Sequence, residues 1–187
     1  MWPGQTLRLP RAGNGAVEVL RVETSWIGQR PRGLLRRFRE PSDLDLDASA
    51  VCFSQGQPVD VVFFRHLVSD DGSIRHSGDS LTTPGPTSES ITVDLARVPV
   101  HVDAVVFTLN SFTGLTFAEV RTVTLRLFDD TAGRELAACA LPANGTSTAY
   151  VLAKLSRLGT DWQVTALQVP ANGRTFQDLM PAIIPLL

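Results

Sequence analysis

Three aspartates recur at every second position in the stretch Asp43-Leu44-Asp45-Leu46-Asp47-Ala48-Ser49. In an extended strand, side chains alternate between faces, so the carboxylates of Asp43, Asp45 and Asp47 share one face. Neighbours on one face are about 6–7 Å apart at a rise of ~3.3 Å per residue. Carboxylates this close repel unless water screens them or a hard cation joins them. The spacing leaves two interpretations open, the solvated end of a strand or half of a calcium site.

The first positions of the EF-hand calcium loop have the same spacing of aspartates, but that loop has two further requirements. The loop needs glycine at its sixth position and a bidentate glutamate at its twelfth. Ala48 and Ser54 stand at those positions. The alternating leucines also favour a strand over a coiled loop. We therefore exclude an EF-hand and expect any metal site to be assembled across strands.

A calcium ion takes about six to eight oxygen ligands, so the three aspartates need help from elsewhere in the fold. The candidates are acidic residues that follow in turns and loops: the Asp70-Asp71-Gly72 turn, Asp79, and Glu89. Backbone carbonyls in the same region would add further ligands. The alternative interpretation is that these are ordinary turn aspartates in contact with water.

The sequence contains none of the common enzyme motifs that we sought. There is no GxSxG elbow, no phosphate-binding glycine loop ending in lysine, and no pair of histidines at helical spacing. His66, His76 and His101 are scattered, and we expect each of them on a strand surface or in a turn. Cys52 lies in an apolar stretch, where burial would raise the pKa of its thiol and make it inert. We therefore expect a protein that is not an enzyme.

Length and composition are those of an ordered globular protein. The 187 residues, 43% hydrophobic and 19% charged, are most simply one domain spanning residues 1–187. Cys52 and Cys139 lack ligand spacing, so we expect free thiols in a reducing compartment. The N-terminus does not resemble a signal peptide, and no apolar run approaches the ~20 residues that span a bilayer. We expect a cytoplasmic location.

Charge is unevenly distributed, although the net charge is only −2. Residues 1–42 hold eight arginines against three glutamates, a net of +5, whereas residues 43–94 hold nine acidic residues against two arginines, a net of −7. The two segments would attract one another or attract different partners. The basic connecting loop 28–42 interleaves its arginines with Leu34, Leu35 and Phe38, a pattern that suits an anionic surface. A solvated loop is the interpretation that we favour.

Short alternating runs separated by turn residues predict an all-β protein, a β-sandwich of two mostly antiparallel sheets with short peripheral helices. The nearly continuous apolar run Val59–Leu67 predicts a central strand covered on both faces. Phe117–Val120 suggests one helical turn. Residues 175–187 suggest a short C-terminal helix, Phe176–Ile184, interrupted by Pro181, and a tail. The other strands are expected at Thr6–Leu9, Val17–Trp26, Asp45–Phe53, Ile74–His76, Ser90–Leu95, Val105–Leu109, Thr122–Phe128, Glu135–Leu141, Thr148–Leu155 and Trp162–Val169.

Several of these segments together resemble the TerD domain family of tellurium-resistance and stress proteins. They are SDLDLDAS at 42–49, DVVFFRHLVSDDGSIRHSGDS at 60–80 and SITVDLARVP at 90–99. The resemblance covers most of the chain and implies a calcium-binding β-sandwich without established enzymatic activity. It also implies a link to tellurite resistance and other stress responses, with action in complexes and, for some members, at the inner face of the membrane.

The resemblance extends to the proposed ligands, with one departure. The positions that match the family's motif directly are Asp43, Asp45, Asp47, Asp71, Gly72, Gly78 and Asp79. The family usually has asparagine where Ser80 stands, followed by a strongly acidic loop, whereas Glu89 is the only acid between Ser80 and the next strand. Fewer charged ligands imply weaker binding of calcium, and one ion rather than two.

Two functional hypotheses from different classes follow. The first is a non-enzymatic calcium-binding stress-response module that acts as a binding or scaffolding subunit in a complex with other stress-response proteins. The alternative is a structural or interaction protein with a degenerate metal site, which associates with anionic membrane or nucleic acid through Arg30–Arg39. Nucleic acid is the less favoured of these partners because the net charge is slightly negative. The oligomeric state is left open.

Overall fold

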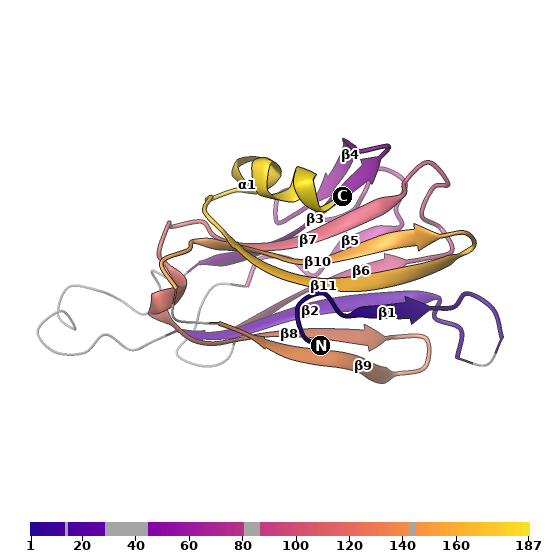
Figure 1. Cartoon of the computed structure of the whole chain (residues 1–187), viewed down its shortest axis with the longest axis horizontal. Coiled ribbons are helices and arrows are strands. Elements are labelled where there is room, and N and C mark those ends of the chain that lie inside the picture. Colours follow the sequence, from indigo (N-terminus) through magenta and orange to yellow (C-terminus); the bar gives the residue numbers. More distant parts are fainter. Residues whose placement is uncertain (14, 29–44, 81–86, 143–144) are drawn as a thin grey trace, which may run out of the picture.

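Two antiparallel β-sheets stack face to face in the computed structural model, which describes residues 1–13, 15–28, 45–80, 87–142 and 145–187 (Figure 1). The six-stranded sheet has the order β1-β11-β10-β7-β3-β4, and the five-stranded sheet has the order β5-β6-β2-β8-β9. Helix α1 lies over the six-stranded sheet, on the side away from the other layer. The predicted β-sandwich with short peripheral helices is confirmed.

The strands are short to medium in length and follow the predicted order. Those of the six-stranded sheet are β1 (Thr6–Leu9), β3 (Leu46–Ser54), β4 (Gln57–Val62), β7 (Ala104–Ser111), β10 (Ala149–Leu158) and β11 (Asp161–Ala171). Those of the five-stranded sheet are β2 (Val19–Gly28), β5 (Ile74–His76), β6 (Thr87–Asp94), β8 (Val120–Asp129) and β9 (Arg134–Leu141). The helical elements are α1 (Phe176–Ile183) and two 3-10 turns, η3 (Phe117–Glu119) and η4 (Ile184–Leu186).

Strand β3 is covered on both faces. Its side chains at even positions, such as Leu46 and Ala48, belong to the core between the two sheets. Val51 and Phe53, at odd positions, belong to a second core that includes buried residues of α1. Because its pairing with β7 runs without a register shift, the alternation holds along the whole strand. Asp47, also at an odd position, therefore lies in a strand that is buried on each side.

The prediction of a central strand over Val59–Leu67 was wrong. Strand β4 ends at Val62 and forms an edge of the six-stranded sheet. The chain then turns through an isolated bridge between Phe63 and His66. The ring of Phe63 packs against Phe176 of α1, with 5.3 Å between the ring centroids. These apolar side chains cover the helix side of the sandwich. A hydrophobic run by itself does not distinguish a segment that packs against a helix from a central strand.

The C-terminal helix begins with a capped first turn. Asp178 accepts hydrogen bonds from the backbone N–H groups of Arg174 (2.9 Å) and Thr175 (3.1 Å), which caps the free amides of the helix start. Pro181 lies inside α1, which continues past it to Ile183 instead of being interrupted there. Among the described residues, no helix is long and apolar enough to cross a membrane.

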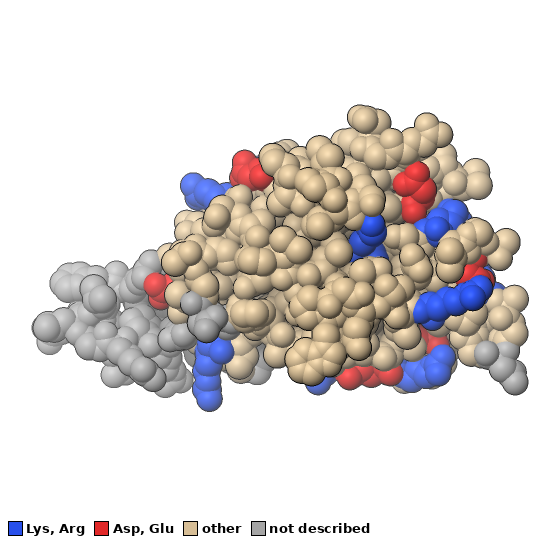
Figure 2. All heavy atoms as spheres, in the orientation of Figure 1, with Lys and Arg blue, Asp and Glu red and all other residues tan. Residues whose placement is uncertain are grey.

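Arginines of the basic N-terminal segment pair with acids from the far half of the chain. Arg8 lies 2.7 Å from Asp161, and Arg21 lies 3.0 Å from Asp130. Figure 2 shows one face of the molecule, where basic and acidic side chains lie near one another, mostly at the right-hand end, beside a broad area with neither. The predicted contact of Arg30–Arg39 with an anionic partner concerns residues outside those described.

Candidate metal centre

Asp45 and Asp47, at the start of β3, lie beside Asp79, which follows β5. One carboxylate oxygen from each residue lies within 4.8 Å of the other two, and we call these three residues the aspartate group. Since β3 and β5 belong to different sheets, the group bridges the two layers. Oxygens on opposite sides of a Ca²⁺ ion are about 4.6–5.2 Å apart at bond lengths of ~2.3–2.6 Å. The three oxygens are therefore close enough to bind one ion.

Two oxygens of the aspartate group are buried without a hydrogen-bond partner. They are Oδ1 of Asp45 and Oδ2 of Asp47, and no described residue donates to them. Asp47 is only 4% exposed, which excludes the solvated strand end as a description of its surroundings. Buried polar atoms in folded proteins are nearly always hydrogen-bonded. A proton or a cation would satisfy these two oxygens.

The pKa shifts of the aspartate group also favour a bound proton or cation. Burial raises the pKa of Asp47 to about 7, and the neighbouring charges of Asp45, Glu89 and Asp79 add to the rise. Burial also raises the pKa of Asp45, with further contributions from Asp79 and Glu89. Without a cation, Asp47 therefore keeps its proton to a higher pH than an ordinary aspartate does. A divalent cation would replace that proton and remove the repulsion between the carboxylates.

Glu89 of β6 fastens the two layers together beside the aspartate group. Its side chain is fully buried, and Oε2 accepts a hydrogen bond of 2.8 Å from the N–H of Ala48. Pairing between β3 and β4 stops at Ala50, so the glutamate supplies the bond that a neighbouring strand would otherwise make. Its Oε1 accepts a hydrogen bond of 3.1 Å from the N–H of Ser80, next to Asp79. Glu89 therefore holds the backbone on both sides of the group.

His76 is a member of this assembly that the sequence reasoning did not find. Its side chain is fully buried in the interior, so the expectation of a surface or turn position was wrong for this histidine. Nδ1 accepts a hydrogen bond of 3.0 Å from the N–H of Gly78, which leaves the proton of a neutral ring on Nε2. Nε2 lies 3.3 Å from Oε2 of Glu89. The alternation of the strand could have indicated this position, because His76 lies two residues after the buried Ile74 and so shares its face.

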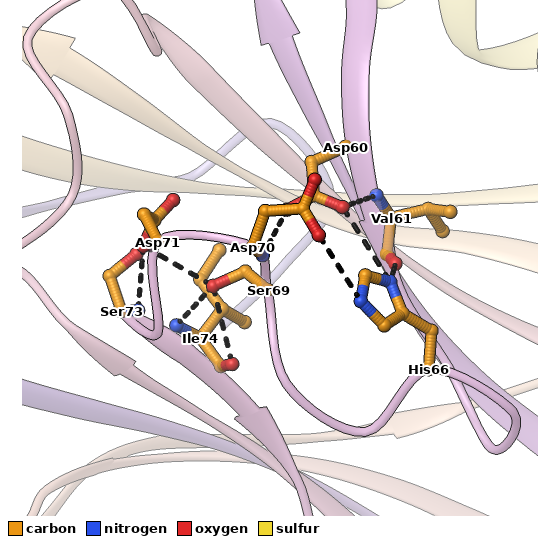
Figure 3. A network of polar contacts seen from close by, with 8 residues as sticks. All are labelled: Asp60, Val61, His66, Ser69, Asp70, Asp71, Ser73 and Ile74. Atoms are coloured by element: carbon orange, nitrogen blue, oxygen red, sulfur yellow. Dashed lines mark hydrogen bonds and ion pairs between the residues drawn. The ribbon is translucent and has the colours of Figure 1, made fainter.

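The remaining predicted ligands lie elsewhere or outside the described residues. Oδ1 of Asp71 accepts hydrogen bonds from the N–H of Ser73 (2.6 Å) and the hydroxyl of Ser69 (3.3 Å), as Figure 3 shows. Gly72 takes a positive φ of 76° in the same turn, a conformation that favours glycine. The structure does not bring Asp71 into the aspartate group. Asp43 lies among the residues that are not described, and its role as a ligand stays a prediction.

The fold and this group define a β-sandwich protein with a candidate cation site bridging its two layers. A family model described as the TerD domain matches residues 1–181. The chain belongs to the TerD domain family.

Relatives with assigned names support the family membership. The chain is 37% identical over 183 residues to the tellurium resistance protein TerZ of Serratia marcescens, covering 96% of this chain and 94% of that one. It is 27% identical over 147 residues to the stress response protein SCP2 of Bacillus subtilis (strain 168), covering 74% of each. A crystal structure of a homologue of the telluride resistance protein TerD from Streptomyces coelicolor A3(2) has the same fold, with a TM-score of 0.72 at 21% identity, over 88% of this chain and 96% of that chain.

Proposed function

We propose that this protein is a non-enzymatic calcium-binding module that acts as a binding or scaffolding subunit in the stress response. The observation that carries the proposal is the pair of buried carboxylate oxygens, on Asp45 and Asp47, without hydrogen-bond partners among the described residues. A cation bound to these oxygens and to Asp79 would neutralise charge that the fold has taken out of water. Glu89 and His76 would hold the ligands in position instead of contacting the ion.

Calcium is the cation that best suits this donor set. The aspartate group offers only carboxylate oxygens, which hard cations prefer, and its members come from two different sheets. Calcium accepts irregular geometry and a variable number of ligands, whereas magnesium demands a near-ideal octahedron. Three aspartates with few further acids predict a single ion of modest affinity.

The relatives supply the physiological context of the proposal. Their names connect them with tellurium resistance and stress response, and we propose the same setting for this chain. In this role the protein works in the cytoplasm in a complex with other stress-response proteins, and calcium stiffens the end of the sandwich that carries the aspartate group. The sequence lacks a GxSxG elbow, a phosphate-binding glycine loop ending in lysine and paired histidines at helical spacing, which supports a binding role over catalysis.

Calorimetric titration of the metal-stripped protein with Ca²⁺ tests the proposal. We expect about one ion per chain and a rise in melting temperature, because a ligand that binds only the folded state stabilises it. Asp47→Asn should lose both effects. Glu135→Gln is the matched control, since Glu135 is exposed and lies 3.6 Å from Arg126 in a surface ion pair. No heat at millimolar Ca²⁺, with an unchanged melting temperature, would refute calcium binding and favour the degenerate-site alternative.

A further inference from the structure

A second cluster of potential ligands lies at the end of β4, outside the aspartate group. Asp60, His66 and Asp70 each offer one atom within 4.8 Å of the other two (Figure 3). We propose that these three residues form a separate site for a late first-row divalent cation, with Zn²⁺ as the representative.

The imidazole of His66 is oriented as a metal-binding histidine is. Its Nδ1 lies 2.8 Å from the carbonyl oxygen of Val61, and only a protonated nitrogen makes a hydrogen bond to a carbonyl. The proton of the neutral ring is therefore on Nδ1, and Nε2 carries a free lone pair. Metal-binding histidines are commonly held in this way, with the second nitrogen donating to a backbone carbonyl.

The free nitrogen faces a carboxylate at a suitable distance. Nε2 of His66 lies 3.6 Å from Oδ1 of Asp70. Two atoms bound to one tetrahedral cation at ~2.1 Å are roughly 3.4 Å apart. A cation between these atoms would thus need only a small movement of either side chain. Asp70 is 89% exposed, so its side chain is free to adjust, and the site is open to ions from solvent.

Asp60 supplies the rigid part of the cluster. Its Oδ1 accepts a hydrogen bond of 2.7 Å from the N–H of Val61, and its Oδ2 accepts one of 3.0 Å from the N–H of Asp70. The second bond ties the backbone of one candidate ligand to the side chain of another. Each carboxylate oxygen has a second lone pair, so these bonds leave Asp60 able to bind a cation. The carboxylate is therefore held beside the imidazole, with its Oδ1 3.7 Å from Nδ1 of His66.

The nitrogen ligand distinguishes this cluster from the aspartate group. Imidazole suits zinc, nickel, copper and iron, whereas calcium takes oxygen ligands only. Zinc is usually four-coordinate, so three protein ligands would leave a coordination position for water. The cluster also joins the edge strand β4 to the segment that crosses to β5 in the other sheet. A bound cation would therefore restrain that crossing.

The alternative is a protonated His66 that pairs with both aspartates and binds no metal. To separate the two, metal-stripped protein is titrated with Zn²⁺ in excess Ca²⁺, by calorimetry, and with Co²⁺ by visible absorption. We expect one Zn²⁺ per chain and Co²⁺ absorption bands of a site with nitrogen and oxygen ligands. His66→Gln and Asp70→Asn should each weaken Zn²⁺ binding by about tenfold or more. His101→Gln, at an exposed histidine, is the matched control.

The outcomes distinguish this site from the proposed calcium site. Asp47→Asn should leave Zn²⁺ binding unchanged, and His66→Gln should leave Ca²⁺ binding unchanged. Asp70→Asn changes an exposed side chain, so its effect can be read even if another variant folds poorly. The proposal is overturned if no Zn²⁺ binds, if His66→Gln binds Zn²⁺ as the wild type does, or if Asp47→Asn abolishes Zn²⁺ binding. The Zn²⁺ titrations can be interpreted in the same way even if Ca²⁺ does not bind.

Discussion

Replacing Asp47 with asparagine should make the calcium-free protein more stable at neutral pH and insensitive to calcium. The carboxylate of Asp47 is buried beside three other acids, and its Oδ2 accepts no hydrogen bond from a described residue. In the absence of a cation, ionising it costs free energy that the unfolded chain does not pay. Asparagine has nearly the same shape and no charge to bury.

The sign and size of the change in stability with pH follow from the pKa of Asp47. Burial raises it to about 7 in the folded protein, from an ordinary value of 3.8. Between these values the folded protein binds the proton more tightly than the unfolded chain, so stability without calcium falls as the pH rises from 4 to 7. At 1.36 kcal/mol per pKa unit, the full shift corresponds to about 4 kcal/mol. Relaxation of the site toward water reduces this, and we expect a loss of about 1–2 kcal/mol between pH 5 and 7.5.

Urea unfolding at pH 5, 6 and 7.5 measures the effect, with and without Ca²⁺. Trp26 and Trp162 are fully buried and provide the fluorescence signal. The free energy of unfolding of the calcium-free wild type should fall across this range, whereas that of Asp47→Asn should fall less. With Ca²⁺ at about 100 times its Kd, the wild type should gain ~2.7 kcal/mol and the variant nothing. Glu135→Gln should behave as the wild type does.

Two results would refute this reasoning. One is a calcium-free wild type whose stability is constant or rises between pH 5 and 7.5. The other is an Asp47→Asn variant that is less stable than the wild type at pH 7.5 without calcium, by more than about 1 kcal/mol. Either would mean that the buried carboxylate is already well compensated within the fold.

Three further predictions concern other parts of the molecule. Glu89→Gln should lower stability by about 1–3 kcal/mol in urea unfolding, because an amide cannot accept both of the glutamate's hydrogen bonds. Gly173→Ala should lower the melting temperature, because the new methyl group would lie 2.7 Å from Cβ of Asp178 in the capped start of α1. A thiol reagent should label Cys139 in the native protein but Cys52 only after unfolding, because burial raises the pKa of the Cys52 thiol to about 12.

Most of the strand pattern could be predicted from the sequence. The period of two between apolar and polar residues is a local property of an extended chain, and it located most of the strands correctly. The failure at Val59–Leu67 has a physical cause. A run of apolar residues does not fix how many of them are buried or by what: Val59 and Leu67 are 46% and 42% exposed, whereas Phe63 packs against Phe176 of α1.

The sequence by itself predicted three aspartates on one face of a strand, and it offered the Asp70-Asp71-Gly72 turn, Asp79 and Glu89 as the groups to meet them. Only the tertiary structure decided how they meet. The stacked layers place residues distant in sequence side by side, bringing Asp79 into the aspartate group and Glu89 into contact with Ala48, 41 positions away. The buried position of His76 and the cluster of His66 with two aspartates were also decided at this level. Residue spacing describes one strand, whereas burial and ligand geometry depend on which strands pack together.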